Sequence, residues 1–302
     1  MLQSNYKNRL LASSSLFLTS IIWGGGFIFT AMALDSGMHP IVVIALRFLI
    51  PSVFMLLFFF KKLSSISFFE LRSGIISGVL VFAGFLSQTY GISLTTPANN
   101  AFITATNVIM VPYISWVLSK AYPGIRSFIL TLTCFAGTII LSWSPEFGLN
   151  FNAGDWLTLL CAFLFACHIS YLSVITKKLK SVVMLNFIQL LSVGILSVLT
   201  ILIFDISTDF SLKTGLTSVI YLGVLATGLC YFLQTWAQCH VSPSRAAIIL
   251  SCEGLFGSLF SVLLGYDKFT SNLLFGGLII LISIILIQVD LSELLKPKNK
   301  QQ

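Results

Sequence analysis

The chain has 302 residues, of which 57% are hydrophobic and only 9% charged, and its formal net charge is +7. So few charges could not cover so much apolar surface in water, which excludes the soluble classes of protein. The basic residues lie in short clusters between apolar runs, which is typical of cytoplasmic loops in a membrane protein and not of a surface that binds nucleic acid.

Ten apolar runs follow one another along the chain, each of roughly the 20 residues that a helix needs to cross a bilayer. The expected spans are 13–34, 40–60, 72–94, 97–119, 125–143, 154–176, 181–204, 213–238, 243–264 and 271–290. The first run is too long for a signal peptide and is interrupted by Gly24-Gly25-Gly26, so we expect it to remain as a helix. The polar link Ser144–Gly154 is the natural boundary between two halves.

The second half repeats the first. Gln88-Thr89, Pro97, Ala101 and Ile103 recur, at a constant offset of 146 residues, as Gln234-Thr235, Pro243, Ala247 and Ile249. We therefore predict two five-helix repeats, 13–143 and 154–290, with tails at 1–12 and 291–302.

The distribution of Lys and Arg predicts the orientation. Alternate loops hold fourteen basic residues in one set and only Lys213 and Lys268 in the other. By the positive-inside rule both termini are cytoplasmic, in the cytoplasmic (inner) membrane. Because each half has an odd number of spans, the second half enters from the opposite side and the repeats are inverted. The predicted fold class is an all-α integral membrane protein of ten transmembrane helices, whose shared site alternates between the two faces.

The order of several short motifs resembles the EamA-type branch of the drug/metabolite transporter superfamily. These motifs are Trp23-Gly24, Arg47-Phe48, Pro97 to Pro112, Pro243, Ala247, Glu253 and Leu263-Leu264-Gly265. The family often has Gly-Glu after its fourth and ninth spans, where this chain has Ser119-Lys120 and Gly265-Tyr266. The resemblance implies ten helices around a central cavity and transport of small metabolites, often amino acids and often outward.

Glu253 is the clearest candidate for a substrate-binding residue, because an ionisable group inside a bilayer is costly. It lies ten residues after Pro243, which places it near the midplane, and its repeat partner is Asn107. Two equivalent polar side chains at mid-depth favour a shared cavity. The alternative is a Glu that neighbouring hydroxyls satisfy in a packed core.

Arg47 lies well inside the second span. It could pair with Glu253, bind a substrate carboxylate or phosphate, or bond to helix-end carbonyls. His168 and Tyr171 lie on one side of the sixth span. A titrating histidine could couple protons to transport, whereas a neutral, hydrogen-bonded His is the structural alternative.

Trp23 lies near the centre of its span, where its ring could face an apolar substrate or simply pack. Gln88, Tyr90 and Gln234 belong to the repeated third and eighth spans, in which roles in gating and in structure are both open.

These features favour a secondary carrier that moves a small organic metabolite, preferably amino-acid-like, by alternating access in export or exchange. Its partners would be that substrate, the lipid bilayer and a coupling proton or counter-substrate. The rival readings are a membrane-embedded enzyme acting on a lipid-like substrate and a small-solute channel. The sequence shows no catalytic, cofactor or metal motif, and the six cysteines lack Cys-x-x-Cys spacing.

Overall fold

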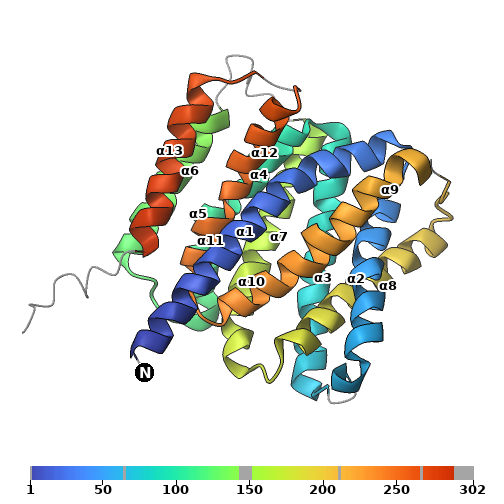
Figure 1. The fold of residues 1–302 in the computed structure, drawn as a ribbon, viewed down its shortest axis with the longest axis horizontal. Coiled ribbons are helices and arrows are strands. Elements are labelled where there is room, and N and C mark those ends of the chain that lie inside the picture. The colour runs from blue at the N-terminus through green and yellow to red at the C-terminus, as the bar shows by residue number, and fades with distance from the viewer. Residues whose placement is uncertain (1, 64–65, 143–151, 210–211, 266–267, 289–302) are drawn as a thin grey trace, which may run out of the picture.

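The structure is a computed structural model that describes residues 2–63, 66–142, 152–209, 212–265 and 268–288 (Figure 1). Within these ranges every regular element is helical. The elements are α1 (Leu2–Asp35), α2 (Pro40–Leu63), α3 (Phe68–Leu94), α4 (Pro97–Ala105), α5 (Asn107–Ser119), α6 (Ile125–Ser142), α7 (Ala153–Ile175), the 3-10 helix η1 (Thr176–Lys178), α8 (Val182–Ile203), α9 (Leu212–Ile220), the π-helix η2 (Tyr221–Leu229), α10 (Cys230–Gln238), α11 (Pro243–Leu250), α12 (Cys252–Leu263) and α13 (Ser271–Gln288).

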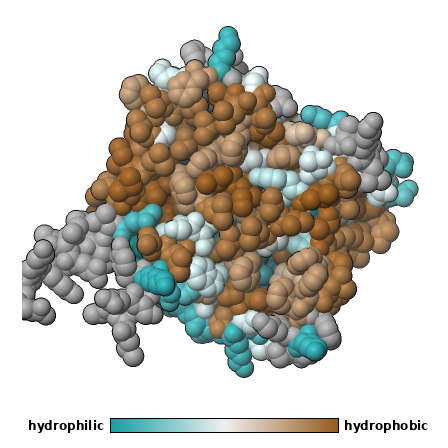
Figure 2. Space-filling model, in the orientation of Figure 1, coloured by the Kyte–Doolittle hydropathy of each residue, from teal (hydrophilic) through white to brown (hydrophobic). Residues whose placement is uncertain are grey.

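Nine spans among the described residues are long and apolar enough to cross a membrane, and a tenth, Ile125–Leu141, is apolar but shorter. Figure 2 shows the matching surface, which is hydrophobic across the middle of the molecule and hydrophilic toward its edges. The predicted ten-helix fold is thereby confirmed. Three spans are not single α-helices: α4 with α5, α9 with η2 and α10, and α11 with α12. The predicted link between the halves falls largely on residues 143–151, outside the described part of the chain.

The fourth helix of each repeat begins with the same N-terminal cap. Thr96 and Ser242 precede the repeated prolines, and their hydroxyls accept hydrogen bonds from the backbone N–H of Asn99 and Arg245. Proline is favoured at the first helical position because the N–H that it lacks would have no partner there. Both repeats therefore start their fourth helix with the same device.

The two repeats interlock around a common centre. In Figure 1, α1 crosses the molecule beside α9, η2 and α10 of the second repeat, and it also packs on α12. The equivalent helix α7 packs in the same way on α3, α4 and α5 of the first repeat. Equivalent helices of the two repeats pack on each other at the two sides of the molecule, α2 on α8 and α6 on α13. This arrangement is that of two inverted repeats, each first helix lying against the other half.

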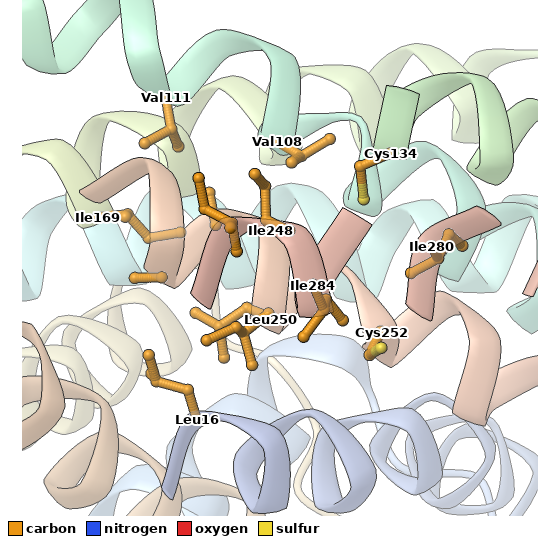
Figure 3. Close-up of a cluster of buried hydrophobic side chains, with 14 of the residues drawn as sticks. Leu16, Val108, Val111, Cys134, Ile169, Ile248, Leu250, Cys252, Ile280 and Ile284 are labelled. Atoms are coloured by element: carbon orange, nitrogen blue, oxygen red, sulfur yellow. The ribbon is translucent and has the colours of Figure 1, made fainter. Parts of the chain in front are cut away.

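The largest apolar cluster joins the α6–α13 pair to the centre. Figure 3 shows its side chains converging from α1, α5, α6, α7, α11, α12 and α13. The labelled members are Leu16, Val108, Val111, Cys134, Ile169, Ile248, Leu250, Cys252, Ile280 and Ile284.

Glycine lets α6 and α13 cross closely. A Cβ atom added at Gly276 would lie 2.6 Å from the carbonyl oxygen of Gly137, closer than a backbone atom can tolerate. One arginine from each repeat then holds the end of α13: Arg126 donates to the Leu286 carbonyl, and Arg245 Nη2 donates to the Ile287 carbonyl at 2.9 Å.

This crossing predicts different effects for two neighbouring glycines. Gly276→Ala should lower the free energy of unfolding by about 1–3 kcal/mol, because backbone must move. Gly277→Ala is the matched control and should cost less, since its Cβ would meet the flexible end of Leu255 at 2.7 Å. Thermal unfolding in detergent, followed by circular dichroism, measures both. Equal losses would contradict the close α6–α13 crossing.

Candidate functional site

A buried cavity of about 40 Å³ lies at the centre of the bundle. Seven of the nine predicted site residues line it: Trp23, Arg47, Gln88, Asn107, His168, Gln234 and Glu253. The remaining lining residues were not singled out from the sequence: Gly26, Phe27, Thr30, Phe85, Phe165, Ile169, Tyr231 and Leu250. A small set of polar groups in a mostly apolar, aromatic wall is typical of small-molecule sites.

Four pairs of lining residues obey the 146-residue offset of the repeat. They are Trp23 with Ile169, Phe85 with Tyr231, Gln88 with Gln234, and Asn107 with Glu253. Both inverted repeats therefore supply the same positions to one cavity. The signal that could have found Phe85 and Tyr231 is their place three residues before the repeated Gln-Thr.

The helices that carry Asn107 and Glu253 are broken at mid-depth. The breaks at Thr106 and Ser251 have nearly the same backbone angles, φ −63° and ψ −12° against φ −61° and ψ −13°. Each hydroxyl donates to the carbonyl three residues earlier, Thr106 to Ile103 at 2.6 Å and Ser251 to Ile248 at 2.8 Å. Such hydroxyls compete with the helix hydrogen bonds. Two continuous spans were expected from the sequence, and the structure divides each of them at a hydroxyl residue.

The Glu253 side chain is 6% exposed and belongs to the first turn of α12. In the described part of the chain it makes no hydrogen bond or ion pair. Glu253 therefore lines a cavity and has no hydroxyl partner. This environment corresponds to the shared cavity, and not to the packed core with neighbouring hydroxyls.

Two carboxamides add unpaired acceptors to the same wall. Asn107 Oδ1 and Gln234 Oε1 are buried, and neither has a hydrogen-bond partner among the described residues. Gln88, by contrast, donates from Nε2 to Thr104 Oγ1 at 3.3 Å. These two carboxamide oxygens are therefore free to accept hydrogen bonds from a ligand or from water.

Arg47 is held by the π-helix and by aromatic rings. Its Nε donates to Thr227 Oγ1 at 3.0 Å, and its guanidinium carbon lies 4.2 Å from the centre of the Phe85 ring. Arg47 forms no ion pair with Glu253 in the described structure. The hydrogen bond from Arg47 Nε goes to the Thr227 hydroxyl and not to a helix-end carbonyl. The guanidinium still lines the cavity.

The π-helix η2 also binds α1. Trp23 Nε1 donates to the Ala226 carbonyl at 2.7 Å, and Tyr221 Oη donates to the Ile22 carbonyl at 2.7 Å. A π-helix shifts its hydrogen bonds by one residue and is often found at functional sites. Hydrophobic periodicity does not reveal such a segment, so Ala226 and Thr227 escaped the sequence analysis.

His168 is hydrogen-bonded inside the bundle. Its Nε2 lies 2.9 Å from Gln189 Oε1, which also accepts a hydrogen bond from Ser77. Tyr171 does not line the cavity but packs against the cluster of Leu172, Ile175 and Leu185. Tyr90 does not line it either: its ring contacts that of His39, 5.8 Å away between centres.

A larger cavity, of about 650 Å³, lies beyond the C-terminal end of α1 and is called the vestibule here. Residues of α1, α3, α4 and α12 form its wall. The buried cluster of Phe27, Ile92 and Ala101 separates it from the central cavity and is called the partition. Phe27 lines the central cavity and Ile92 lines the vestibule, so the partition is shared by the two.

The repeat counterparts of the partition lie toward the opposite face and include polar groups. They are Ser173, Gln238 and Ala247. Gln238 Nε2 donates to the Ile169 carbonyl at 2.9 Å, and Thr176 Oγ1 donates to the Gln238 carbonyl at 3.4 Å. One closure is thus apolar, and the equivalent closure on the other side is hydrogen-bonded.

The fold and the central cavity define a multi-pass membrane protein of the transporter class. The model of the EamA-like transporter family matches residues 10–143 and 152–289. The chain belongs to this family, within the drug/metabolite transporter superfamily.

Relatives and a solved structure agree with this assignment. The chain is 34% identical over 285 residues to an uncharacterized transporter of Archaeoglobus fulgidus, covering 93% of this chain and 87% of that protein. It is 24% identical over 273 residues to the uncharacterized transporter YoaV of Bacillus subtilis, covering 86% and 91%. A crystal structure of 16% sequence identity shares the fold, with a TM-score of 0.75 over 91% of this chain and 96% of that one.

The contact between Arg47 and Thr227 predicts a stability difference between two variants. Thr227→Val should lower the free energy of unfolding by about 1.5–3 kcal/mol, because it removes a hydrogen bond to a buried charged group. Thr227→Ser keeps the hydroxyl and should stay close to wild type. Thermal unfolding in detergent would test this, and an equally stable Val variant would show that Arg47 does not depend on Thr227.

Proposed function

We propose that the chain is a secondary carrier that moves a small, amino-acid-like metabolite across the cytoplasmic membrane by alternating access, in export or exchange. The observation that carries the proposal is the set of four repeat-related pairs around one cavity. A fixed site between inverted repeats can be exposed to either face when one repeat moves against the other. Both termini lie in the cytoplasm in this proposal.

The charges of the cavity support a zwitterionic substrate. Glu253 and Arg47 line the same small space, and no ion pair joins them in the described structure. A substrate ammonium group would be placed at Glu253 and the unpaired Asn107 oxygen, and a substrate carboxylate at the guanidinium, which suits planar carboxylates. Trp23 and Tyr231 would contact the remaining, apolar part of the substrate.

The two cavities support alternating access. A water needs roughly 10–15 Å³ of such volume, so the central cavity of about 40 Å³ has room for a few waters and must widen to admit a metabolite. The vestibule lies at the end of α1 away from its basic N-terminal residues, which is the external end in the proposed orientation. The partition is then an external gate, and the breaks at Thr106 and Ser251 are points where the helices can bend.

Reconstituted transport tests the carrier and the role of Glu253 together. Purified protein in liposomes should take up a labelled amino acid saturably, and Glu253→Gln should lower this uptake about tenfold or more, equal to roughly 1.4 kcal/mol of lost binding. Ser258→Ala is a control on the same helix, where the hydroxyl donates to Gly254, and should leave uptake unchanged.

Each other outcome of this assay has a clear meaning. Uptake preserved in Glu253→Gln would remove Glu253 from the substrate site. Uptake that never saturates would favour a channel, and a chemically altered solute would favour an enzyme. An imposed pH gradient separates the coupling partners, because proton coupling requires the rate to follow the gradient, whereas exchange requires a solute inside the liposome.

Labelling of introduced cysteines tests the partition as a gate. Ser93 lines the vestibule, and Gln88, five residues earlier on α3, lines the central cavity. In a Cys239→Ser background, a membrane-impermeant maleimide added outside intact cells should label Ser93→Cys quickly and Gln88→Cys slowly. Adding Ile92→Ala should speed the labelling of Gln88→Cys and leave that of Ser93→Cys unchanged. Equal rates at both positions without Ile92→Ala would contradict an external gate.

A further inference from the structure

A second feature of the molecule lies outside the transport path. A groove of about 360 Å³ runs between α2, η2 and α10, and it is called the α2–α10 groove here. Its walls include Pro51, Phe54 and Phe59 of α2 and Val224 and Phe232 of the eighth span, and every residue that lines it is apolar. Val183, at the start of α8, also lines it.

The contact that the repeat symmetry relates to this one, between α3 and α8, is tightly packed. There α3 meets α8 through Gly74 and Gly78, at which an added Cβ would lie 2.6 Å from the Cβ atoms of Ile188 and Ser192. Val224 is the repeat counterpart of Gly78, and its side chain is 49% exposed. Val224 thus lines an open groove at the position where Gly78 lets α3 and α8 approach, while α2 and η2 touch beside it at Gly223 and Gly228. The two-fold symmetry of the fold is broken at this place.

The position of the groove determines what can occupy it. It extends along α2 from Ile50 to Phe59, within a span that is long and apolar enough to cross the hydrocarbon core. Apolar side chains at that depth are surrounded by lipid acyl chains. The groove is therefore an apolar recess that faces lipid.

Basic residues stand close in the chain to residues at the end of this recess. Lys61 follows Phe59 on α2 and is exposed at the surface. Lys177, Lys178 and Lys180 are also exposed and stand just before Val183 in the chain. Lysines at the cytoplasmic end of an apolar recess between helices match the phosphate of an anionic lipid, and each contributes about 1 kcal/mol near a membrane surface.

We propose that the α2–α10 groove binds an anionic phospholipid, with one acyl chain between α2 and α10 and the headgroup phosphate at Lys61 and Lys180. The bound chain contacts Pro51 and Gly228, which already touch: a Cβ added at Gly228 would lie 3.0 Å from Pro51 Cβ. Thr227, whose hydroxyl accepts the hydrogen bond from Arg47, immediately precedes Gly228 in the chain. The lipid thereby supports the packing of α2 on η2 from the outside, independently of the identity of the substrate.

Native mass spectrometry of the full chain, released from nanodiscs, tests the proposal. With phosphatidylglycerol and phosphatidylcholine of identical acyl chains, the protein should retain phosphatidylglycerol preferentially. Val224→Trp fills the groove and should abolish this retention. Leu225→Trp is the matched control, since Leu225 is 40% exposed on the same helix but does not line the groove.

The lysines are tested separately, which keeps the proposal testable if Val224→Trp fails to fold. Lys61→Gln and Lys180→Gln should each lower phosphatidylglycerol retention about fivefold, the factor that corresponds to 1 kcal/mol per lysine. Lys120→Gln, an exposed lysine after α5, should have no effect. Equal retention in the Val224→Trp and Leu225→Trp proteins would overturn the site. Equal retention of the two lipids, unchanged by the lysine variants, would overturn its anionic specificity.

Discussion

The backbone inside a bilayer must satisfy its own hydrogen bonds, and the rest of this structure depends on how that constraint is met. Long α-helices meet it almost everywhere in the described chain. Exceptions occur beside the central cavity: the helices are interrupted at Thr106 and Ser251, where hydroxyl bonds add to the backbone bonds, and η2 shifts its bonds by one residue. Carbonyls and hydroxyls of η2 then become partners for Trp23 and Arg47. The irregular backbone thus supplies partners to cavity residues, although η2 also has a lipid-facing side at Val224.

The repeat is equivalent in position but not in chemistry. Asn107 takes the place of a second Glu253, and the charge opposite comes from Arg47, on a helix outside the four pairs. Two carboxylates in so small a space would repel each other, and one would stay protonated. One acid, one amide and one guanidinium give the cavity a dipolar character instead. The closures differ in the same manner, apolar at Phe27 and Ile92 and hydrogen-bonded at Gln238.

The sequence alone was sufficient for the ten spans and the inverted repeat, because apolar run length and a constant offset are one-dimensional signals. Seven of the residues that it singled out line the central cavity, because polar side chains are costly in contact with lipid and therefore face the interior of the bundle. Tyr90 lies outside the cavity because two residues beyond Gln88 is a rotation of about 200° around a helix. Tyr171 lies beyond the stretch of α7 from Phe165 to Ile169 that lines the cavity. Whether any of these residues binds substrate stays a prediction. The π-helix and the partition depend on packing, which no local pattern records.

The four repeat-related pairs have a consequence for the ancestry of such a chain. Each half contributes only one member of every pair, so a single half cannot enclose the cavity. It could do so only by meeting a copy of itself inserted upside down in the same membrane. Fusing two halves removes that requirement, because the odd number of spans inverts the second copy automatically. Fusion also lets the copies diverge, so that an amide can face a carboxylate where two identical subunits would have to present the same residue twice.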